Sequence, residues 1–458
     1  MTEIVNGRGN AVLAAREHKP FFRRFSPPQI LVGGFAIVIL MGAALLCLPL
    51  STASGQQTGF LTALFTATSA VCVTGLVVVD TGTYWSIFGQ AIILFLIQVG
   101  GLGFMTTATF FFLLMGRRIG LKERMLIRES LNQLNMAGIV RMVKAVLLFT
   151  LVTEGVFTLI LSWRWFPELG WPRCLWFGLF HSISAFNNSG FDVFGQFRSL
   201  TGYVNDVVVN FSITTLIILG GIGFSVVLEV YNWRCKKLSV HTRLVIIITV
   251  LLILTGFLFF LLLEWSNTLR FLPLQGKFLA AYFQSVVPRT AGFNTVDISH
   301  LRSATQFLLI ILMFIGASPG STGGGIKTTT FGLLLMAGWS LAAGKEDVEI
   351  LNRRIPSRQV YKALSVLLLA MSLVIIMTLV LSVTEERDFL TTLFETVSAF
   401  GTVGLSMGLT PQLTDPGRIA IIFTMFSGRL GPLTLTYALA QRRRKPFVRH
   451  PEEKIIIG

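Results

Sequence analysis

Long apolar stretches alternate along the chain with short polar segments. Eight of these stretches are long enough to cross a membrane, since a helical span needs about 20 apolar residues to bridge roughly 30 Å of hydrocarbon. They cover residues 30–50, 86–115, 143–163, 206–231, 243–264, 304–317 continuing to 340, 361–383 and 417–440. The pattern predicts an all-α integral membrane protein with eight spans.

Composition supports this prediction, and charge orients the spans. Hydrophobic residues make up 53% of the 458 residues and charged residues only 13%, with a mean hydropathy of +0.72. The net charge of +16 could indicate nucleic-acid binding, but 27 of the 38 Lys and Arg residues fall in five short segments, 1–24, 117–144, 234–243, 345–362 and 442–458. The positive-inside rule places these segments in the cytoplasm. We therefore expect cytoplasmic termini, 1–29 and 441–458, and no nucleic-acid partner.

The four cysteines and the start of the chain carry no further signal. The cysteines lack CxxC or histidine spacing, so neither a zinc site nor a disulfide framework is indicated for Cys47, Cys72, Cys174 and Cys235. Residues 1–28 are polar and basic, with no apolar stretch before Ile30, and do not resemble a cleaved signal peptide.

One twelve-residue motif occurs four times, each time between two spans. The copies read LFTATSAVCVTG, LFHSISAFNNSG, AYFQSVVPRTAG and LFETVSAFGTVG, and they end at Gly75, Gly190, Gly292 and Gly404. An aromatic residue stands ten positions before each glycine, and Ser-Ala recurs at Ser69, Ser184 and Ser398. Such a segment is too short to cross the membrane, which favours a re-entrant loop.

Four matched units at a nearly constant period indicate one pseudo-fourfold domain. Each unit is a transmembrane helix, a pore loop and a second transmembrane helix around a central pore. The predicted repeats are residues 30–115, 141–231, 243–340 with a broken inner helix, and 359–440.

The end of each motif is predicted to line that pore. Non-helical backbone at membrane depth is tolerated only beside a water-accessible cavity, where carbonyl oxygens can replace the water shell of a cation. Glycine allows the positive φ that aims successive carbonyls inward. The candidate filter residues are Val73, Thr74, Gly75, Asn188, Ser189, Gly190, Thr290, Ala291, Gly292, Thr402, Val403 and Gly404. The alternative is that these glycines only permit close helix packing, which we favour for GGLGF at 100–104 and GGIGF at 220–224.

The third unit is interrupted by a glycine-rich segment. Five glycines and a proline within ten residues disfavour a helix, so a loop is predicted at mid-membrane, below the filter. The candidate gate residues are Gly316, Ala317, Ser318, Pro319, Gly320, Ser321, Thr322, Gly323, Gly324 and Gly325. The segment fails the phosphate-loop pattern GxxxxGK[ST] by one residue, because Ile326 precedes Lys327. A linker between spans is the alternative. However, the segment starts only 13 residues after Ser303, which is too few for the chain to cross the membrane first.

Two basic residues belong to the same hypothesis. Arg429 stands in an apolar span at the position of Gly101 and Gly221, where an arginine needs a carbonyl, a carboxylate or water as partner. We expect it to hold the loop closed or to form a cation barrier, with snorkelling to the cytoplasmic edge as the alternative. Lys327 is predicted to act similarly, nearer the inside.

These residues carry a family resemblance. The four pore segments, GASPGSTGGGIKTTT in the third unit and GRLGPLTL around Arg429 resemble the Trk/Ktr/HKT superfamily of potassium transporters. The resemblance covers almost the whole chain and is closest to the Ktr branch, the membrane subunits of bacterial Ktr potassium-uptake systems. Trk-type relatives carry additional amino-terminal spans, whereas the first span here begins near Ile30.

The resemblance implies K⁺ as the transported ion and Na⁺ as a possible activator, with no organic cofactor. It also implies a homodimer in the lipid of the bacterial cytoplasmic membrane, with one pore per subunit. The implied partner is a cytoplasmic KtrA-type regulatory ring that binds ATP or ADP and opens the gate.

Three other functions are compatible with parts of the sequence. A coupled secondary transporter would favour an acidic residue near the midplane, for which Glu154 is the best candidate. An enzyme is disfavoured because HExxH, GxSxG and clustered His and acidic residues are missing from the spans. A purely structural subunit would tolerate alanine at the pore glycines.

Overall fold

The computed structural model describes residues 27–103, 139–232 and 237–439, with Thr106, Thr107, Thr109, Met125 and Glu453 in addition. This part of the chain is helical apart from short 3₁₀ turns, loops and one hairpin of β1 (Glu349–Ile350) and β2 (Arg353–Arg354). Most of both predicted cytoplasmic termini, and Cys235, lie outside the described residues.

Four units of similar construction follow one another along the chain. The first contains α1 (Pro27–Leu46), α2 (Phe60–Val71), α3 (Thr81–Tyr84) and α4 (Ile87–Leu102). The second contains α7 (Ile139–Leu169), α8 (Arg173–Phe186), α9 (Val207–Gly221) and α10 (Phe224–Tyr231). The third contains α11 (Val240–Glu264), α12 (Leu274–Val286), α13 (Ser303–Phe314) and α14 (Thr328–Ala342). The fourth contains α15 (Ser357–Thr384), α16 (Phe389–Gly401), α17 (Asp415–Leu430) and α18 (Pro432–Leu439).

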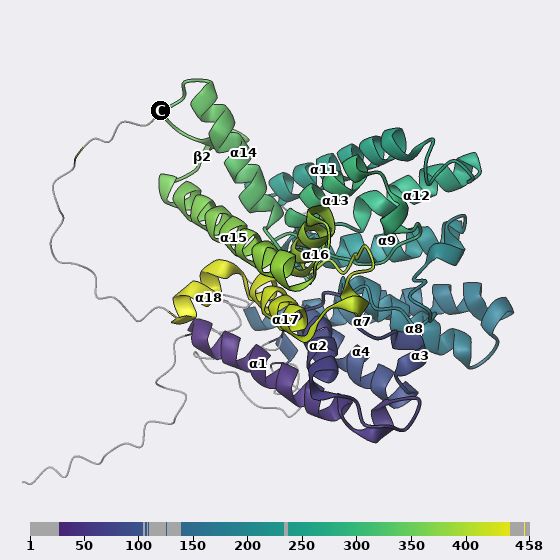
Figure 1. Cartoon of the computed structure of the whole chain (residues 1–458). Helices are drawn as coiled ribbons and strands as arrows, with labels where there is room; N and C mark the ends of the chain where they lie inside the picture. Colours follow the sequence, from purple (N-terminus) through teal and green to yellow (C-terminus); the bar gives the residue numbers. More distant parts are fainter. Residues whose placement is uncertain are drawn as a thin grey trace, which may run out of the picture.

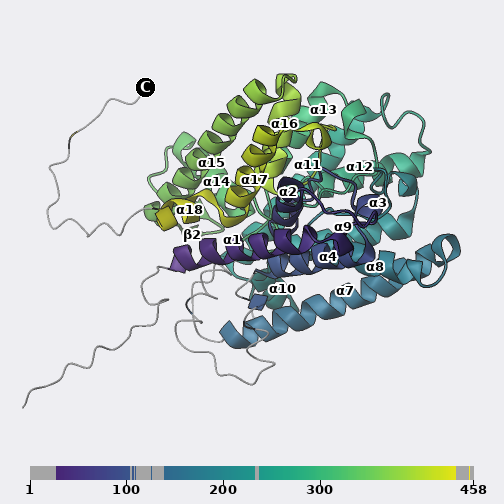
Figure 2. The ribbon, with the colours of Figure 1, turned by 60° about the horizontal axis from the view of Figure 1, so that its bottom comes forward.

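The units are arranged in a closed circle. In Figure 1 the colours pass around the molecule from the purple first unit, through blue, teal and green, to the fourth unit, which runs from light green to yellow. The fourth unit then meets the first, because α17 packs against α2 and α18 against α1, and Figure 2 shows α18 beside α1. The fold class predicted from the repeats, an all-α protein with four pseudo-repeats around a centre, is confirmed.

Among the described residues, the first helix of each unit is the one that is long and apolar enough to span a membrane uninterrupted. The four spans are Pro28–Leu46, Val140–Leu169, Val240–Glu264 and Ser357–Thr384. Leucine, isoleucine and valine side chains on these helices are exposed in the structure, as expected for surfaces that face lipid. The second helices, α2, α8, α12 and α16, are short, amphipathic and largely buried.

The inner helices are all interrupted, although the apolar pattern predicted a break only in the third. Gly103, Gly223 and Gly431 have φ of +81°, +98° and +82° at equivalent positions. In the second unit this glycine separates α9 from α10, which differ in direction by 99°. The predicted span 206–231 is therefore one bent pair of helices, because a residue with positive φ cannot continue a right-handed helix.

Close packing explains another glycine of the same motifs. A Cβ added to Gly100, Gly220 or Gly428 would overlap the carbonyl oxygen of Val71, Phe186 or Phe400, respectively, at the end of the preceding pore helix. The packing role predicted for GGLGF and GGIGF is thus confirmed for their first glycine.

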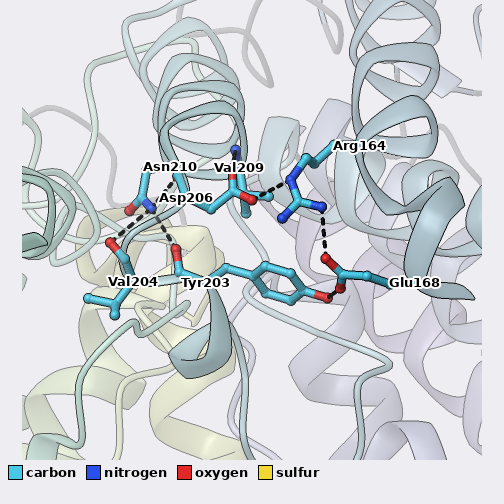
Figure 3. A network of polar contacts seen from close by, with 7 residues as sticks. All are labelled: Arg164, Glu168, Tyr203, Val204, Asp206, Val209 and Asn210. Atoms are coloured by element: carbon cyan, nitrogen blue, oxygen red, sulfur yellow. Dashed lines mark hydrogen bonds and ion pairs between the residues drawn. The ribbon is translucent and has the colours of Figure 1, made fainter.

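A polar network fixes the start of α9 to the end of α7 (Figure 3). The Arg164 guanidinium donates to Asp206 and to Glu168, and the Tyr203 hydroxyl donates to Glu168 at 2.7 Å. The Asp206 carboxylate also accepts from Val209 N at 3.0 Å and so caps α9. This network sets the position of the helix whose other end contacts the glycine-rich loop.

Candidate functional site

The four motif glycines form a ring at the centre of the circle. A Cβ built on each glycine would clash with the carbonyl oxygen that precedes the glycine of the next unit. The pairs are Gly75 with Ser189, Gly190 with Ala291, Gly292 with Val403, and Gly404 with Thr74. The ring therefore has room for main chain only.

The backbone of the four segments follows one repeated pattern. Two positions in each segment have positive φ, namely the glycine and the residue two positions before it. The latter residues are Val73, Asn188, Thr290 and Thr402, with φ of +57°, +59°, +84° and +51°. Side chains disfavour this region, so its recurrence at four equivalent positions indicates a conformation that the surrounding structure imposes.

In two of the motifs, the hydroxyl of the recurrent serine accepts a hydrogen bond from the backbone N–H of the glycine. Ser69 Oγ accepts a hydrogen bond from Gly75 N, and Ser398 Oγ accepts one from Gly404 N, both at 3.1 Å. Ser184 Oγ donates to Phe191 O at 2.7 Å instead. The sequence revealed these serines as a repeat but gave no role for them.

A cavity of about 860 Å³ opens on one side of the ring. All four motif glycines line it, together with Asp80, Asp192 and Asp297. Burial, reinforced by the nearby charge of Asp80, raises the pKa of Asp192 to about 7, although a hydrogen bond from Phe194 N opposes the rise. This side of the ring thus presents carboxylates, which attract cations.

The glycine-rich loop between α13 and α14 packs against the other side of the ring. Gly324 N donates to Thr402 Oγ1 at 3.1 Å. A Cβ on Gly323 would overlap the side chain of Thr290. Two glycines of the loop therefore pack directly beneath two candidate filter residues. A side chain at either glycine would overlap Thr290 or Thr402.

The same loop is bonded to the kink of the second unit. Ser318 N donates to Gly221 O at 3.0 Å, Thr322 N to Gly220 O at 3.2 Å, and Phe224 N to Gly320 O at 2.9 Å. The kink at Gly223 makes this possible, because Phe224 N would otherwise bond to Gly220 O in a continuous helix. These three bonds involve backbone atoms alone.

Arg429 and Lys327 also contact the loop. The Arg429 guanidinium donates to Thr322 O of the loop and to the carbonyl oxygens of Gly100 and Gly101. Those two carbonyls lie in the last turn of α4, where intrahelical partners are lacking. Lys327 Nζ donates to Gly323 O at 2.7 Å. The Arg429 side chain thus points into the protein, so the geometry does not support the snorkelling alternative.

A second cavity, of about 670 Å³, lies on the far side of the loop. Its lining includes Lys327, Arg429, His241 and Lys362, and Gly323 and Gly325 contribute from the loop. The loop therefore separates an acidic cavity beside the glycine ring from a basic cavity. No group of three or more His, Cys, Asp or Glu residues suited to a metal ion occurs within the described ranges.

Comparison with known proteins identifies this architecture. The sequence profile of the TrkH family, described as cation transport protein, matches residues 10–446. The chain is 46% identical to the Ktr system potassium uptake protein B of Bacillus subtilis over 95% of its length and 97% of the relative. It is 39% identical to the potassium/sodium uptake protein NtpJ of Enterococcus hirae, over 95% of this chain and 98% of that one.

A solved structure has the same fold. The potassium transporter TrkH from Vibrio parahaemolyticus superimposes with a TM-score of 0.70, covering 95% of this chain and 87% of that chain at 21% sequence identity. At this identity the similarity establishes the arrangement of helices.

Proposed function

Because the chain belongs to the TrkH family of cation transport proteins, we propose that it carries potassium into a bacterial cell through the glycine ring. Family membership also confirms that the chain is a transporter rather than an enzyme. The observation that carries the proposal is the ring itself, in which four glycines each face the main chain of the next unit. Such a ring supplies carbonyl oxygens and excludes side chains, which suits coordination of a dehydrated cation.

In this proposal the filter consists of the twelve residues at 73–75, 188–190, 290–292 and 402–404. The acidic cavity is its extracellular entrance, and the basic cavity is its cytoplasmic exit. The loop at 316–325, with Lys327 and Arg429, is the gate. Its bonds to Gly220, Gly221 and Thr402 support a closed state, since they hold the loop across the route between the two cavities.

We propose the partners of this chain from the names of its relatives. The names of relatives describe one component of a Ktr system, so we propose that this chain acts with a cytoplasmic nucleotide-binding subunit and forms a homodimer. Sodium is proposed as an activating ion, in line with the potassium/sodium uptake name of another relative.

The direct test is ion uptake into cells that lack their own potassium-uptake systems. We expect cells that express this chain with its regulatory partner to accumulate K⁺ and Rb⁺ in preference to Na⁺. Absence of cation uptake, with the protein present in the membrane, would contradict the proposal.

Gly223→Ala is expected to loosen the gate. A Cβ at this position would lie 2.7 Å from Pro319 O of the loop, and the φ of +98° already disfavours a side chain. The loop would have to move from the kink, so uptake without the regulatory partner should rise about fivefold, as for loss of one or two hydrogen bonds. Rb⁺ uptake by cells that express the chain alone measures this.

Gly431→Ala is the matched control, because its φ is +82° and a Cβ there meets nothing within 4 Å. It tests the strain of the kink without a clash against the loop. Equal effects of the two substitutions would contradict a specific role for Gly223.

Uptake at low K⁺ should depend on pH through Asp192. Since burial raises the pKa of this carboxyl to about 7, it becomes neutral as the pH falls from 8 to 6. The entrance then loses a negative charge, and we expect the apparent affinity for K⁺ to fall about two- to threefold. In Asp192→Asn, the apparent affinity for K⁺ should equal the low-pH affinity of the wild type at every pH between 6 and 8.

Asp297→Asn provides the comparison. Although burial acts in the opposite direction, hydrogen bonds from Ser299 and His300 keep the pKa of Asp297 below its ordinary value. This residue stays charged between pH 6 and 8, so its loss should lower the affinity equally at both values. A pH profile unchanged by Asp192→Asn would show that another group titrates.

A further inference from the structure

A buried carboxylate lies behind the second filter segment. Glu154, in the middle of α7, has a relative exposure of only 4%. Its carboxylate accepts hydrogen bonds from Gln98 Nε2 at 3.2 Å and from Asn187 Nδ2 at 3.1 Å. Within the described part of the chain, no lysine, arginine or histidine pairs with it. Burial of a polar carboxyl group at this depth costs free energy that an apolar side chain would avoid, which makes a purely structural role a poor explanation.

Asn187 connects this carboxylate to the filter. It is the last residue before the segment 188–190, and it caps the pore helix α8. Its side-chain Nδ2 also lies 2.7 Å from Gln98 Oε1 and 2.9 Å from Ile183 O. The next residue, Asn188, already has the positive φ of the filter. The orientation of Asn187 therefore decides where the second filter segment begins.

The neighbouring helix leaves space for this arrangement. A Cβ on Gly101 of α4 would overlap the Asn187 side chain. Gln98 lies on the same helix, one turn earlier, and contacts both Glu154 and Asn187. Three helices, α4, α7 and α8, thus contribute one polar group each to a compact cluster.

The cluster is specific to the junction of the first two units. At the positions equivalent to Gln98, counted from the packing glycine, the second and fourth units have Ile218 and Phe426. At the position equivalent to Asn187, counted from the filter glycine, the other units have Cys72, Arg289 and Gly401. The other three units thus have the same fold but lack this combination of carboxyl and amide side chains.

We propose that Glu154 is a positioning residue for cation selectivity. Its carboxylate orients Asn187, directly and through Gln98, and thereby fixes the second filter segment relative to the other three. The inference rests on the proposed function of the glycine ring as a cation filter. Glu154 Oε1 accepts from Asn187 and Glu154 Oε2 accepts from Gln98, so this one side chain restricts the orientation of both amides at once.

The test is the ratio of Rb⁺ to Na⁺ uptake in Glu154→Gln. This variant keeps the shape of the side chain but turns one acceptor into an NH₂ group, which then faces the NH₂ group of either Asn187 or Gln98. We expect the ratio to fall about threefold or more, as for the net loss of one hydrogen bond. A role in folding alone would lower uptake of both ions together and leave the ratio unchanged.

The exchanged pair Gln98→Glu with Glu154→Gln is the matched variant. It returns one carboxylate to the cluster, on α4, where Asn187 Nδ2 already lies 2.7 Å from the side-chain oxygen. We expect it to recover most of the ratio. Failure of the exchanged pair to recover the ratio would overturn the proposal, as would an unchanged ratio in Glu154→Gln.

Two further measurements separate the possible outcomes. If Glu154→Gln does not reach the membrane, Gln98→Met removes one donor to the same carboxylate, and an unchanged ratio in that variant would overturn the inference. Gly292→Ser is measured in parallel. If the wild type does not prefer Rb⁺ over Na⁺ and Gly292→Ser has no effect, the proposed function itself fails. If the wild type and Glu154→Gln both prefer Rb⁺ over Na⁺ to the same degree, only the positioning role is refuted.

Discussion

Cells that express Arg429→Ala without a regulatory partner should take up Rb⁺ about tenfold faster than cells with the unchanged chain, which corresponds to a loss of about 1.4 kcal/mol from the closed state. The guanidinium joins the loop at Thr322 O to two carbonyls of α4, Gly100 O and Gly101 O. Alanine removes all of these bonds at once. The closed loop then has unpaired carbonyls in a buried site, which weakens the closed state relative to an open one.

Arg429→Lys is the informative companion. An ammonium is a compact donor and cannot present the planar fork that reaches the loop and α4 together. We expect an intermediate rate of uptake. Unchanged or slower uptake in Arg429→Ala, at a normal amount of protein in the membrane, would refute the gate hypothesis.

Gly292→Ser should abolish the preference for K⁺ over Na⁺ and lower total uptake. The glycine has φ +72°, and a Cβ there would lie 2.6 Å from Val403 O and 3.1 Å from the Gly190 Cα. Two other filter segments must therefore shift to accommodate the side chain. Because selectivity depends on the number and position of the coordinating carbonyls, the ratio of Rb⁺ to Na⁺ uptake should fall about tenfold, toward unity.

Gly33→Ser is the control for this prediction, since Gly33 lies in α1, where a Cβ meets nothing within 4 Å. It should leave uptake and preference as in the wild type. A normal preference in Gly292→Ser would mean that the ring does not select the ion.

The sequence predicted the four glycine-containing segments of the ring because the same twelve-residue motif occurs in all four units. A single glycine such as Gly75 is ambiguous between packing and positive φ, but four copies in one register are not. The same comparison showed that Arg429 occupies the position equivalent to Gly101 and Gly221. The contact of Arg429 with the loop agrees with the predicted need for a carbonyl partner.

The kinks were not predictable by the same means. GGLGF contains three glycines, and a one-dimensional pattern does not distinguish Gly100, which packs, from Gly103, which has positive φ. The distinction depends on which helix lies alongside, and that is a property of the assembled fold. The partners of Glu154 were hidden for the same reason, because Gln98 and Asn187 are 56 and 33 residues away from it.

The backbone bonds between the loop and the α9–α10 kink have a consequence for hydration. If the loop moves away as in the proposed gate, Ser318 N and Thr322 N lose their acceptors, and Gly220 O and Gly221 O lose their donors. Gly220 O can regain a donor from Phe224 N if the kink straightens into a continuous helix. Ser318 N and Thr322 N lie in the loop and have no helical acceptor to return to, so water is the partner that replaces the one each has lost. In the proposed gate, departure of the loop and wetting of the passage are therefore coupled, so that a displaced but dry loop is not a stable resting state.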